Sequence, residues 1–437
     1  MNEPDSLEAA ATPRDEPLLF VNASQIVTCA GPARARRGAE MNDAGIRTGV
    51  AVAVRNGKVA AVDTVDTLRR DFAGVREVDL RDHILLPGFV DSHTHSIFGR
   101  PRFDEQEMRA AGLDYMEIAR RGGGIHSSVR DLRTKTEDEL FALARARLRR
   151  LATFGTTTVE VKSGYGLTLE DELKSLRVIA RLNDVLPLRI IPTFLGAHEI
   201  PLEHRTSQES RKSYVDLLIH EMIPAVAKAK LATFADVFCE TGVYTTDESR
   251  AILSAAREHG LLLKLHADEL TSSGGAELAA SIGATSADHL AAVSDDGIRA
   301  LGAGNTVATL LPGTMLFLGK TKHAPARRFI EAGVPIALAT DFNPGTSPTA
   351  NLSLVLTLGV SQLRLSVAEA VIAATVNGAA AVALADRVGQ IAPGFAADFA
   401  VFSVTDLREV PYWYGDNRCV ATFVAGKPCY TSDLGIT

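Results

Sequence analysis

The sequence of 437 residues predicts an α/β fold, a (β/α)8 TIM-like barrel with a small composite β-sheet domain built from both chain ends. Eight short apolar runs alternate with amphipathic stretches over roughly 270 residues, which is the size of such a barrel. The runs are nearly continuous in apolar residues, as in parallel strands that are covered on both faces. Segments rich in β-forming residues stand before the first run and after the last, which predicts the composite sheet.

The eight runs are the expected barrel strands. In chain order they are LPGFVD (86–91), TTTVEVKS (156–163), LRIIPTFLG (188–196), FADVFCE (234–240), LLLKLHADE (261–269), ATSADHL (284–290), NTVATLLPG (305–313) and VPIALATD (334–341). The stretches between them are expected to be helices, among them 135–152, 168–183, 208–230 and 246–259. A doubly wound sheet is the competing architecture, but no G-x-G-x-x-G follows the first strand. The barrel is therefore the favoured prediction.

The same pattern divides the chain into four segments. They are a disordered leader (1–16), the N-terminal part of the small β domain (17–84), the barrel (85–384) and the C-terminal part of the small β domain (385–437). In the N-terminal part, Asn56 and Gly57 stand between alternating apolar residues. This pair predicts a hairpin with a two-residue type I′ turn.

Composition limits the partners that the protein can have. The formal net charge is −7, and Lys and Arg are dispersed except in a basic patch at 144–150, expected to be the solvated face of a helix. No nucleic-acid partner is therefore expected. No apolar run reaches the roughly 18 residues needed to span a bilayer, and the N-terminus lacks the features of a signal peptide. The four cysteines match neither a zinc site nor a disulfide framework. We expect a cytoplasmic protein that acts on a small molecule, without a membrane partner.

The strand ends carry the residues with the strongest chemical signal. Five of the eleven histidines close predicted barrel strands, namely His93, His95, His198, His266 and His289. A single histidine at a strand end is more often a hydrogen-bonded rim residue than a ligand, but the pair His93 and His95 aims two imidazoles the same way. With His266 and Asp341 at two further strand ends, the leading interpretation is one divalent metal per chain, zinc or iron.

Three polar residues near these groups have simpler interpretations. Cys239 is expected to pack as a small buried side chain rather than to bind metal. Lys162 and Lys264 each lie two residues inside a strand-end group, and we expect them to pair with Glu160 or another carboxylate in the barrel. The sequence gives neither lysine a role.

Motifs spread over the chain carry a resemblance to a known family. They are SHTHSIFG with Arg102, EIARRGGGI, VEVKSGYGL, TFLGAHEIP, DVFCE, KLHADE, SADHL, LLPG, ALATDFNPGTSP and YWYGDN. From about Leu18 onward the sequence resembles the imidazolonepropionases of the amidohydrolase superfamily. The H-x-H pair alone is specific only for the superfamily, whereas KSGYGL, LGAHEIP and ATDFNPG together are far more discriminating.

The resemblance implies a metal-dependent hydrolase that acts on the C–N bond of a cyclic amide and is often a homodimer. Its reaction opens 4-imidazolone-5-propanoate to N-formimidoyl-L-glutamate in histidine degradation. It implies metal ligands at His93, His95, His266 and Asp341. It also implies substrate contacts from Arg102, Tyr165, His198, Glu269, Asn343, Gly345 and Thr346. The sequence departs from the family pattern at Pro101 and Gln106, on either side of Arg102.

The chemistry of ring opening suggests roles for these groups. A carboxylate near the metal can take a proton from the attacking water and return it to the leaving nitrogen, and Glu269, three residues after His266, is the natural candidate. His289 is suited to orient the water or to stabilise the oxyanion, and Asp341 to share the proton transfer. Arg102 offers a planar bidentate donor for the propionate. The sequence does not divide the proton transfer among Glu269, His289 and Asp341.

Three other functions are alternatives to this one. An aminopurine or pyrimidine deaminase would use a similar metal site but has no need of an arginine for a propionate. A binuclear hydrolase is disfavoured, because the fourth strand ends in Cys239 and Glu240 without a lysine for a bridging carbamate. A catalytically silent barrel is also disfavoured, because convergent polar groups cost stability unless something is bound between them.

Overall fold

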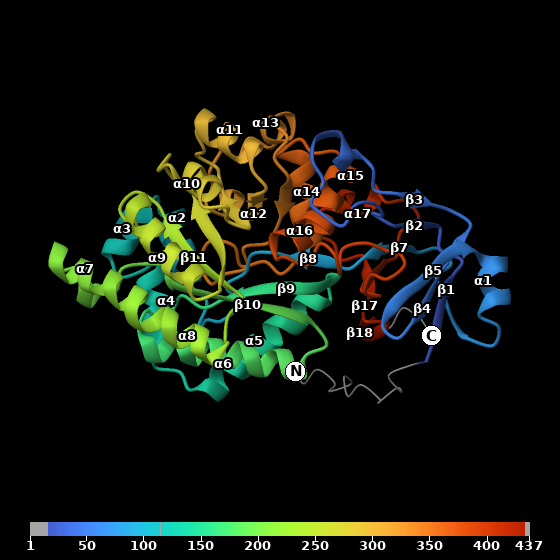
Figure 1. Cartoon of the computed structure of the whole chain (residues 1–437), viewed down its shortest axis with the longest axis horizontal. Helices are drawn as coiled ribbons and strands as arrows, with labels where there is room; N and C mark the ends of the chain where they lie inside the picture. The colour runs from blue at the N-terminus through green and yellow to red at the C-terminus, as the bar shows by residue number, and fades with distance from the viewer. Residues whose placement is uncertain (1–15, 114, 433–437) are drawn as a thin grey trace.

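The computed structural model describes residues 16–113 and 115–432, and Figure 1 shows a barrel of strands and helices beside a smaller β unit. The blue N-terminal and red C-terminal segments of the chain lie together in this smaller unit. The composite β domain and the barrel predicted from the sequence are therefore confirmed. Of the predicted leader, all but Glu16 lies outside the described residues.

The barrel consists of one sheet of eight strands in sequence order, and neighbouring strands pair in parallel. Its strands are β8 (Phe89–Asp91), β9 (Thr156–Lys162), β10 (Arg189–Ala197), β11 (Phe234–Cys239), β12 (Leu262–Ala267), β13 (Ser286–His289), β14 (Val307–Leu310) and β15 (Ile336–Leu338). Each lies within one of the predicted runs or extends it by a residue at most. A parallel bridge between Thr94 and Phe342, just beyond β8 and β15, joins the first strand to the last.

The helices of the barrel follow the predicted order. They are α2 (Asp104–Ala110), α3 (Tyr115–Arg120), α4 (Ile125–Arg133), α5 (Glu137–Ala152), α6 (Leu169–Val185), α7 (Gln208–Leu217), α8 (Ile223–Ala229), α9 (Thr246–Glu258), α10 (Gly275–Ser281), α11 (Asp295–Ala303), α12 (Pro312–Phe317), α13 (Ala326–Glu331), α14 (Leu352–Ser361), α15 (Val367–Ala374) and α16 (Val376–Ala381). A π turn at Leu218–Met222 joins α7 to α8.

Local sequence explains where the long helices begin. In α5, the Thr136 side chain accepts a hydrogen bond from the Glu139 backbone, and Glu139 caps the Thr136 backbone in return. Thr245 and Glu248 form the same capping box at the start of α9. These boxes satisfy N–H groups that have no partner inside the helix, so the ends were readable from the sequence.

The smaller unit contains two sheets. The four-stranded sheet has the order β5 (Lys58–Thr64), β4 (Val50–Arg55), β1 (Leu18–Val21) and β6 (Arg76–Asp79), with α1 (Val65–Asp71) packed against it. The six-stranded sheet has the order β18 (Lys427–Thr431), β17 (Cys419–Val424), β16 (Phe399–Phe402), β7 (Ile84–Pro87), β2 (Gln25–Val27) and β3 (Ile46–Arg47). The short helix α17 (Glu409–Tyr412) lies between β16 and β17. Strands from both chain ends thus share the six-stranded sheet.

The predicted hairpin is present between β4 and β5. Arg55 pairs with Lys58, so that only Asn56 and Gly57 form the loop. Their φ angles are 54° and 70°, and a type I′ turn requires positive φ at both positions.

The run expected to open the barrel divides into two strands at Gly88. β7 before it pairs with β16 in the smaller unit, whereas β8 after it pairs with β9 in the barrel. A Cβ atom on Gly88 would lie 2.1 Å from the Thr157 side chain, so the chain can cross between the two units only with glycine here. Periodicity does not reveal this change of sheet, because both strands are buried and apolar.

Among the described residues, no helix is both long and apolar enough to cross a membrane.

Candidate active site

The closure of the barrel brings the two ends of the predicted ligand set together. The His95 backbone N–H donates to the Phe342 carbonyl (2.8 Å), and the Asp341 N–H donates to the His93 carbonyl (3.0 Å). These hydrogen bonds connect the loop after β8 to the loop after β15. Asp341 has a φ of 52°, a conformation that residues other than glycine rarely adopt and that is often found at functional sites.

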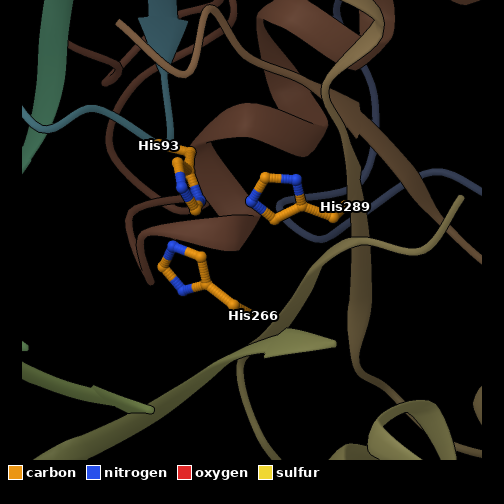
Figure 2. Close-up of side chains that lie close together, drawn as sticks. All are labelled: His93, His266 and His289. Atoms are coloured by element: carbon orange, nitrogen blue, oxygen red, sulfur yellow. The ribbon is translucent and has the colours of Figure 1, made fainter. Parts of the chain in front are cut away.

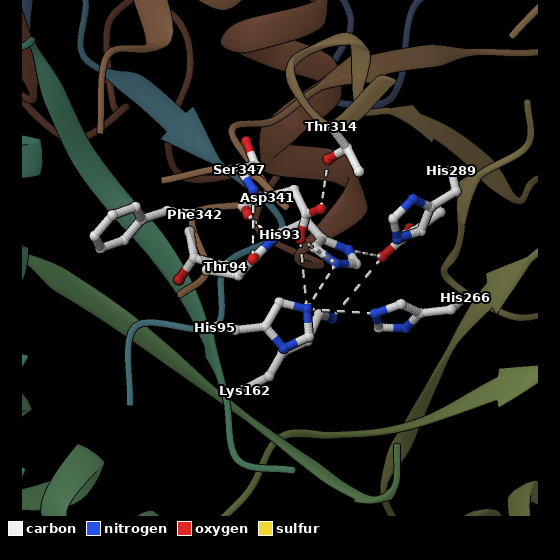
Figure 3. Close-up of polar contacts among 12 residues, drawn as sticks. His93, Thr94, His95, Lys162, His266, His289, Thr314, Asp341, Phe342 and Ser347 are labelled. Atoms are coloured by element: carbon white, nitrogen blue, oxygen red, sulfur yellow. Dashed lines mark hydrogen bonds and ion pairs between the residues drawn. The ribbon is translucent and has the colours of Figure 1, made fainter. Parts of the chain in front are cut away.

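Four nitrogen and oxygen atoms converge at this rim, as Figure 3 shows. The Nε2 atom of His95 lies 3.3 Å from that of His93 and 3.4 Å from that of His266. An Asp341 carboxylate oxygen, Oδ1, lies 3.5 Å from the Nε2 atoms of both His93 and His95. With metal–ligand bonds of about 2.0–2.1 Å, the ligand atoms of a tetrahedral zinc site stand about 3.3–3.4 Å apart. These four separations are close to that spacing, which supports one divalent cation held among these atoms.

The contacts of the predicted ligand rings with buried carboxylates support this fit. His93 Nδ1 lies 2.6 Å from an Asp288 carboxylate oxygen, and His266 Nδ1 lies 2.9 Å from Asp236. A ring that donates through Nδ1 carries its lone pair on Nε2, which is the atom turned toward the cluster. Lone pairs facing one another at this distance repel, and a cation between them turns that repulsion into coordination. The donor set thus suits a metal.

Burial keeps the imidazoles of His93 and His95 neutral, which is the form that binds metal. It lowers the pKa of His93 and of His95 well below the usual value, and nearby positive charges add to the effect. Burial also raises the pKa of Asp341 to about 6, against the opposing effect of a hydrogen bond from the Thr314 hydroxyl (2.6 Å). A neighbouring cation would favour the ionised carboxylate.

His289 lies beside the cluster at the end of β13. Figure 2 shows its ring facing His93 and His266, and one nitrogen from each of these three rings lies within 4.8 Å of the others. His289 Nε2 also lies 3.6 Å from a Glu269 carboxylate oxygen. Burial raises the pKa of Glu269 well above its usual value, and the negative charges of Asp341 and Glu240 add to the shift. Glu269 and His289, two of the three residues predicted to take part in proton transfer, are therefore neighbours.

A cavity of about 540 Å³ opens above the cluster. Of the residues predicted for the site, His95, Arg102, Tyr165, His198, His266, Glu269, His289, Asp341, Asn343 and Thr346 line it. His93 is fully buried beneath the lining. Gly345 is not among the lining residues, because it packs on Arg102: a Cβ atom at Gly345 would lie 1.8 Å from the guanidinium.

Several buried groups hold Arg102 in the wall of the cavity. Its Nε lies 3.2 Å from a Glu105 carboxylate oxygen, and its Nη1 donates to the Ser128 hydroxyl (3.2 Å). The Arg102 N–H donates to the Pro344 carbonyl (2.7 Å), which fixes the loop despite the unusual residues Pro101 and Gln106. Arg102 is therefore a buried cation facing the cavity, where an anionic substrate group would find it.

On the same wall, His198 is also fixed. Its Nδ1 lies 2.9 Å from the Gly164 carbonyl, so that this nitrogen donates and Nε2 is left as an acceptor. Burial lowers the pKa of His198 to about 3. Its ring stacks on that of His95 at a centroid distance of 4.9 Å. A neutral His198 thus connects the predicted metal cluster with the predicted substrate contacts.

The basic patch at 144–150 is not wholly a solvated helix face, and that prediction was wrong for Arg147. The Arg147 guanidinium donates to the Phe98 and Gly99 carbonyls (2.5 and 2.6 Å) and lies over the Phe98 ring. Burial lowers its pKa to about 10. The position of Arg147 in the helix predicted an exposed side chain. Because α5 lies against the loop after β8, Arg147 instead supports the loop that carries His93 and His95.

Sequence reasoning also missed the groups behind the ligands and one cation in the cavity. Asp236 and Asp288 orient ligand rings, and Arg109 lines the cavity beside Arg102. The two aspartates could have been found, because a charge within an otherwise apolar buried strand needs a partner. Arg109 had no such signal, since helices commonly carry exposed arginines.

Comparisons with known proteins show the family to which the chain belongs. A family model described as "Amidohydrolase family" matches residues 108–430. Imidazolonepropionase from Geobacillus kaustophilus (strain HTA426) is 45% identical over 416 residues, which cover 94% of this chain and 97% of the relative. Imidazolonepropionase from Porphyromonas gingivalis (strain ATCC BAA-308 / W83) is 43% identical over 424 residues, 96% of this chain and 99% of the relative.

Solved structures show the same fold at much lower identity. E. coli guanine deaminase has a TM-score of 0.70 at 17% identity and covers 95% of this chain and 99% of its own. An adenosine deaminase from Xanthomonas campestris with bound zinc has a TM-score of 0.69 at 19% identity, covering 96% and 94%. These likenesses show the fold alone. The family model places the chain among the amidohydrolases. Within that family, it belongs with the imidazolonepropionases.

Proposed function

We propose that this chain hydrolyses the C–N bond of a cyclic amide, converting 4-imidazolone-5-propanoate to N-formimidoyl-L-glutamate in histidine degradation. One observation carries the proposal: a metal-type cluster of imidazoles and a carboxylate lies in the same cavity as the buried cation Arg102. Relatives of this name match nearly the whole chain. A deaminase would use the cluster but has no need of the arginine.

The proposed metal ligands are His93, His95, His266 and Asp341. Three imidazoles and one carboxylate suit zinc and iron(II) alike, so we propose one ion of either kind per chain. Such an ion supplies Lewis acidity, which lowers the pKa of water and polarises the carbonyl under attack. Burial holds the rings of His93 and His95 neutral, and the hydrogen bond between His93 Nδ1 and Asp288 turns the His93 Nε2 atom inward.

Glu269 is the proposed proton-transfer group. It takes the proton of the attacking water and returns it to the ring nitrogen as the C–N bond breaks. Its raised pKa suits the second of these steps, because the carboxyl holds its proton until the leaving nitrogen needs it. His289, 3.6 Å from Glu269, is placed to orient the water or to donate to the developing oxyanion. Asp341 shares the proton transfer in this proposal.

The remaining cavity residues are proposed to hold the substrate. Arg102 binds the propionate through two parallel N–H groups, and Tyr165 and His198 complete the contacts to carboxylate and ring. Asn343 and Thr346 line the product side, where their side chains are joined by a hydrogen bond of 2.9 Å. Gly345 contributes indirectly, because only glycine leaves room for the Arg102 guanidinium.

The assembly and location are part of the same proposal. We propose a homodimer in the cytoplasm, supported by the family resemblance and by four cysteines that are all free. Sedimentation equilibrium of the purified protein tests the dimer, and a species of one chain's mass, 46.6 kDa, would contradict it.

The activity is tested with purified protein and two sets of substrates. We expect loss of imidazolone absorbance with 4-imidazolone-5-propanoate and no ammonia from a panel of aminopurines and aminopyrimidines. Ammonia release without ring opening would overturn the proposal in favour of a deaminase. A chelator should abolish ring opening, and restoring Zn²⁺ or Fe²⁺ separately, together with metal analysis of the isolated protein, distinguishes the two ions.

A further inference from the structure

Beneath the predicted ligands lies a buried ammonium group to which the reaction assigns no part. Lys162, the last residue of β9, is fully buried, and its Nζ donates to Glu160 (2.7 Å) and to Asp236 (2.8 Å). An Asp288 carboxylate oxygen lies 3.9 Å away. Each of these three carboxylates has a second contact, and each of those contacts leads toward a predicted metal ligand.

The first connection runs through Asp236. The Asp236 oxygen that accepts from Lys162 also lies 2.9 Å from His266 Nδ1, and its other oxygen accepts from the His266 backbone N–H (3.2 Å). The side chain and the backbone of this ligand are therefore both held by one carboxylate, whose position is fixed in turn by Lys162.

The other connections lead to the H-x-H pair. The Asp288 oxygen nearest Lys162 is the one that accepts from His93 Nδ1, at 2.6 Å. Glu160 accepts from the backbone N–H of Thr94, the residue between His93 and His95 (3.2 Å). Figure 3 shows Lys162 close to the ligand rings and the chain around Thr94.

We propose that Lys162 is a positioning residue that sets the affinity of the metal site. It holds the carboxylates that orient two ligand rings and the backbone of the pair. A buried ion pair is costly to desolvate and adds little stability compared with apolar packing, so its use here is the placement of other groups. The inference rests on the proposed metal site, and it concerns metal affinity rather than the identity of the substrate.

Lys264 offers a matched control. It is just as buried, stands in β12 of the same barrel, and its Nζ lies 3.8 Å from Asp288. Its hydrogen bonds go to two backbone carbonyls, those of Ser92 (3.0 Å) and Ala381 (3.2 Å). Lys264 thus shares the charge and depth of Lys162 without its contacts to Glu160 and Asp236.

The experiment compares Lys162→Met with Lys264→Met in the full-length protein. Zn²⁺ affinity is measured by competition with a chromophoric chelator, and the unfolding midpoint is measured with and without Zn²⁺. We expect Lys162→Met to weaken Zn²⁺ binding by about 10- to 100-fold, the usual cost of losing a group that orients metal ligands. Its Zn²⁺-induced rise in midpoint should shrink accordingly. Lys264→Met should lower the unfolding midpoint measured without Zn²⁺, but its Zn²⁺ affinity should stay within about threefold of the wild-type value.

A charge-balanced variant covers the case in which Lys162→Met does not fold. Glu160→Gln with Lys162→Met removes one charge of each sign, so the buried set keeps its net charge. If Lys162 acts only by balancing charge, this double variant should bind Zn²⁺ like the wild type, which would overturn the proposal. If it positions Asp236, affinity should stay at least about tenfold weaker.

The outcomes separate this inference from the proposed function. Wild-type affinity in Lys162→Met, or an equal loss in Lys264→Met, would overturn the role of Lys162 while the enzyme still opens the imidazolone. A wild-type protein that binds Zn²⁺ but does not turn over the imidazolone would overturn the reaction and leave the Lys162 result standing.

Discussion

In the smaller unit, Phe20 packs edge-on against Phe399 and Phe423, with ring centroids 5.2 and 5.0 Å away. Inside the barrel, Lys162 is buried just as completely, but between the carboxylates of Glu160 and Asp236. The first arrangement is stabilised by removing apolar surface from water and needs no specific partner. The second loses hydration energy on burial and is tolerated only while every charge keeps its partners. The Phe20 cluster therefore contributes stability, whereas we propose that the Lys162 set places the predicted metal ligands.

The largest effect expected from this difference follows from His266→Ala in the barrel. The variant loses one of the proposed metal ligands, so metal content should fall to background and turnover should drop by more than about 10³-fold. Metal analysis of the purified variant, together with the ring-opening assay, measures both. Full metal occupancy would remove His266 from the ligand set.

Glu269→Gln should separate chemistry from metal binding within the same cavity. The amide cannot accept a proton from water, so turnover should fall by about 10²- to 10⁴-fold. Metal content should stay at one ion per chain, because Glu269 lies outside the proposed ligand set. Activity within a few-fold of the wild type would transfer the proton role to His289 or Asp341.

Phe20→Ala tests the smaller unit. Truncating a buried phenylalanine usually costs about 3–5 kcal/mol, and here it leaves a void between two sheets. The unfolding free energy from urea titration should fall by that amount, while metal content and turnover of the folded protein stay unchanged. A loss of metal in this variant would show that the two regions are not separable.

Arg102→Met should affect specificity more than chemistry. A hydrogen bond to a charged group is worth about 1.5–3 kcal/mol, so kcat/KM should fall by one to two orders of magnitude. If the contact also orients the ring, kcat should fall as well. The wild type should prefer the propionate over the corresponding amide, and the variant should lose that preference. An unchanged ratio would place the carboxylate elsewhere, near Tyr165 or His198.

The smallest effect is expected at an exposed charge of the smaller unit. Hydrogen bonds from Arg408 lower the pKa of Asp406 to about 2, against about 3.9 for an unfolded aspartate. Because the folded-state pKa is the lower one, this stabilisation is complete above about pH 5 and disappears as the pH falls through roughly 4 to 2. Asp406→Asn should cost less than about 1 kcal/mol at pH 7 and clearly less near pH 2, where the folded carboxyl is about half protonated. Urea unfolding of both proteins at pH 7 and pH 2 measures this difference. An equal loss of unfolding free energy at the two pH values would show that the Asp406 charge is not the cause.

The predicted metal ligands show most clearly how much of the site the sequence alone could predict. His93, His95, His266 and Asp341 were predicted from their places at strand ends. The structure clusters His93, His95 and Asp341 and places the Nε2 atom of His266 3.4 Å from that of His95. The assignment of these residues as ligands stays a prediction, as do the substrate contacts. The hairpin at Asn56 and the capping boxes can also be recognised from the sequence, because turn and cap chemistry depends on neighbouring residues.

The tertiary structure decided which buried charged side chains contact one another. Periodicity shows that Lys162 and Asp236 lie in buried strands, but their contact depends on how β9, β10 and β11 align. Likewise, His266 lies beside Asp288 only because of the register in which β12 and β13 pair. The same holds for Arg147, whose helix position gave no sign of the loop it supports. The sequence by itself determined which elements form and which residues stand at the rim, since those follow from local patterns of apolar residues, turns and caps. Which charge meets which was decided only in three dimensions, because such contacts join residues that are far apart along the chain and leave no local pattern.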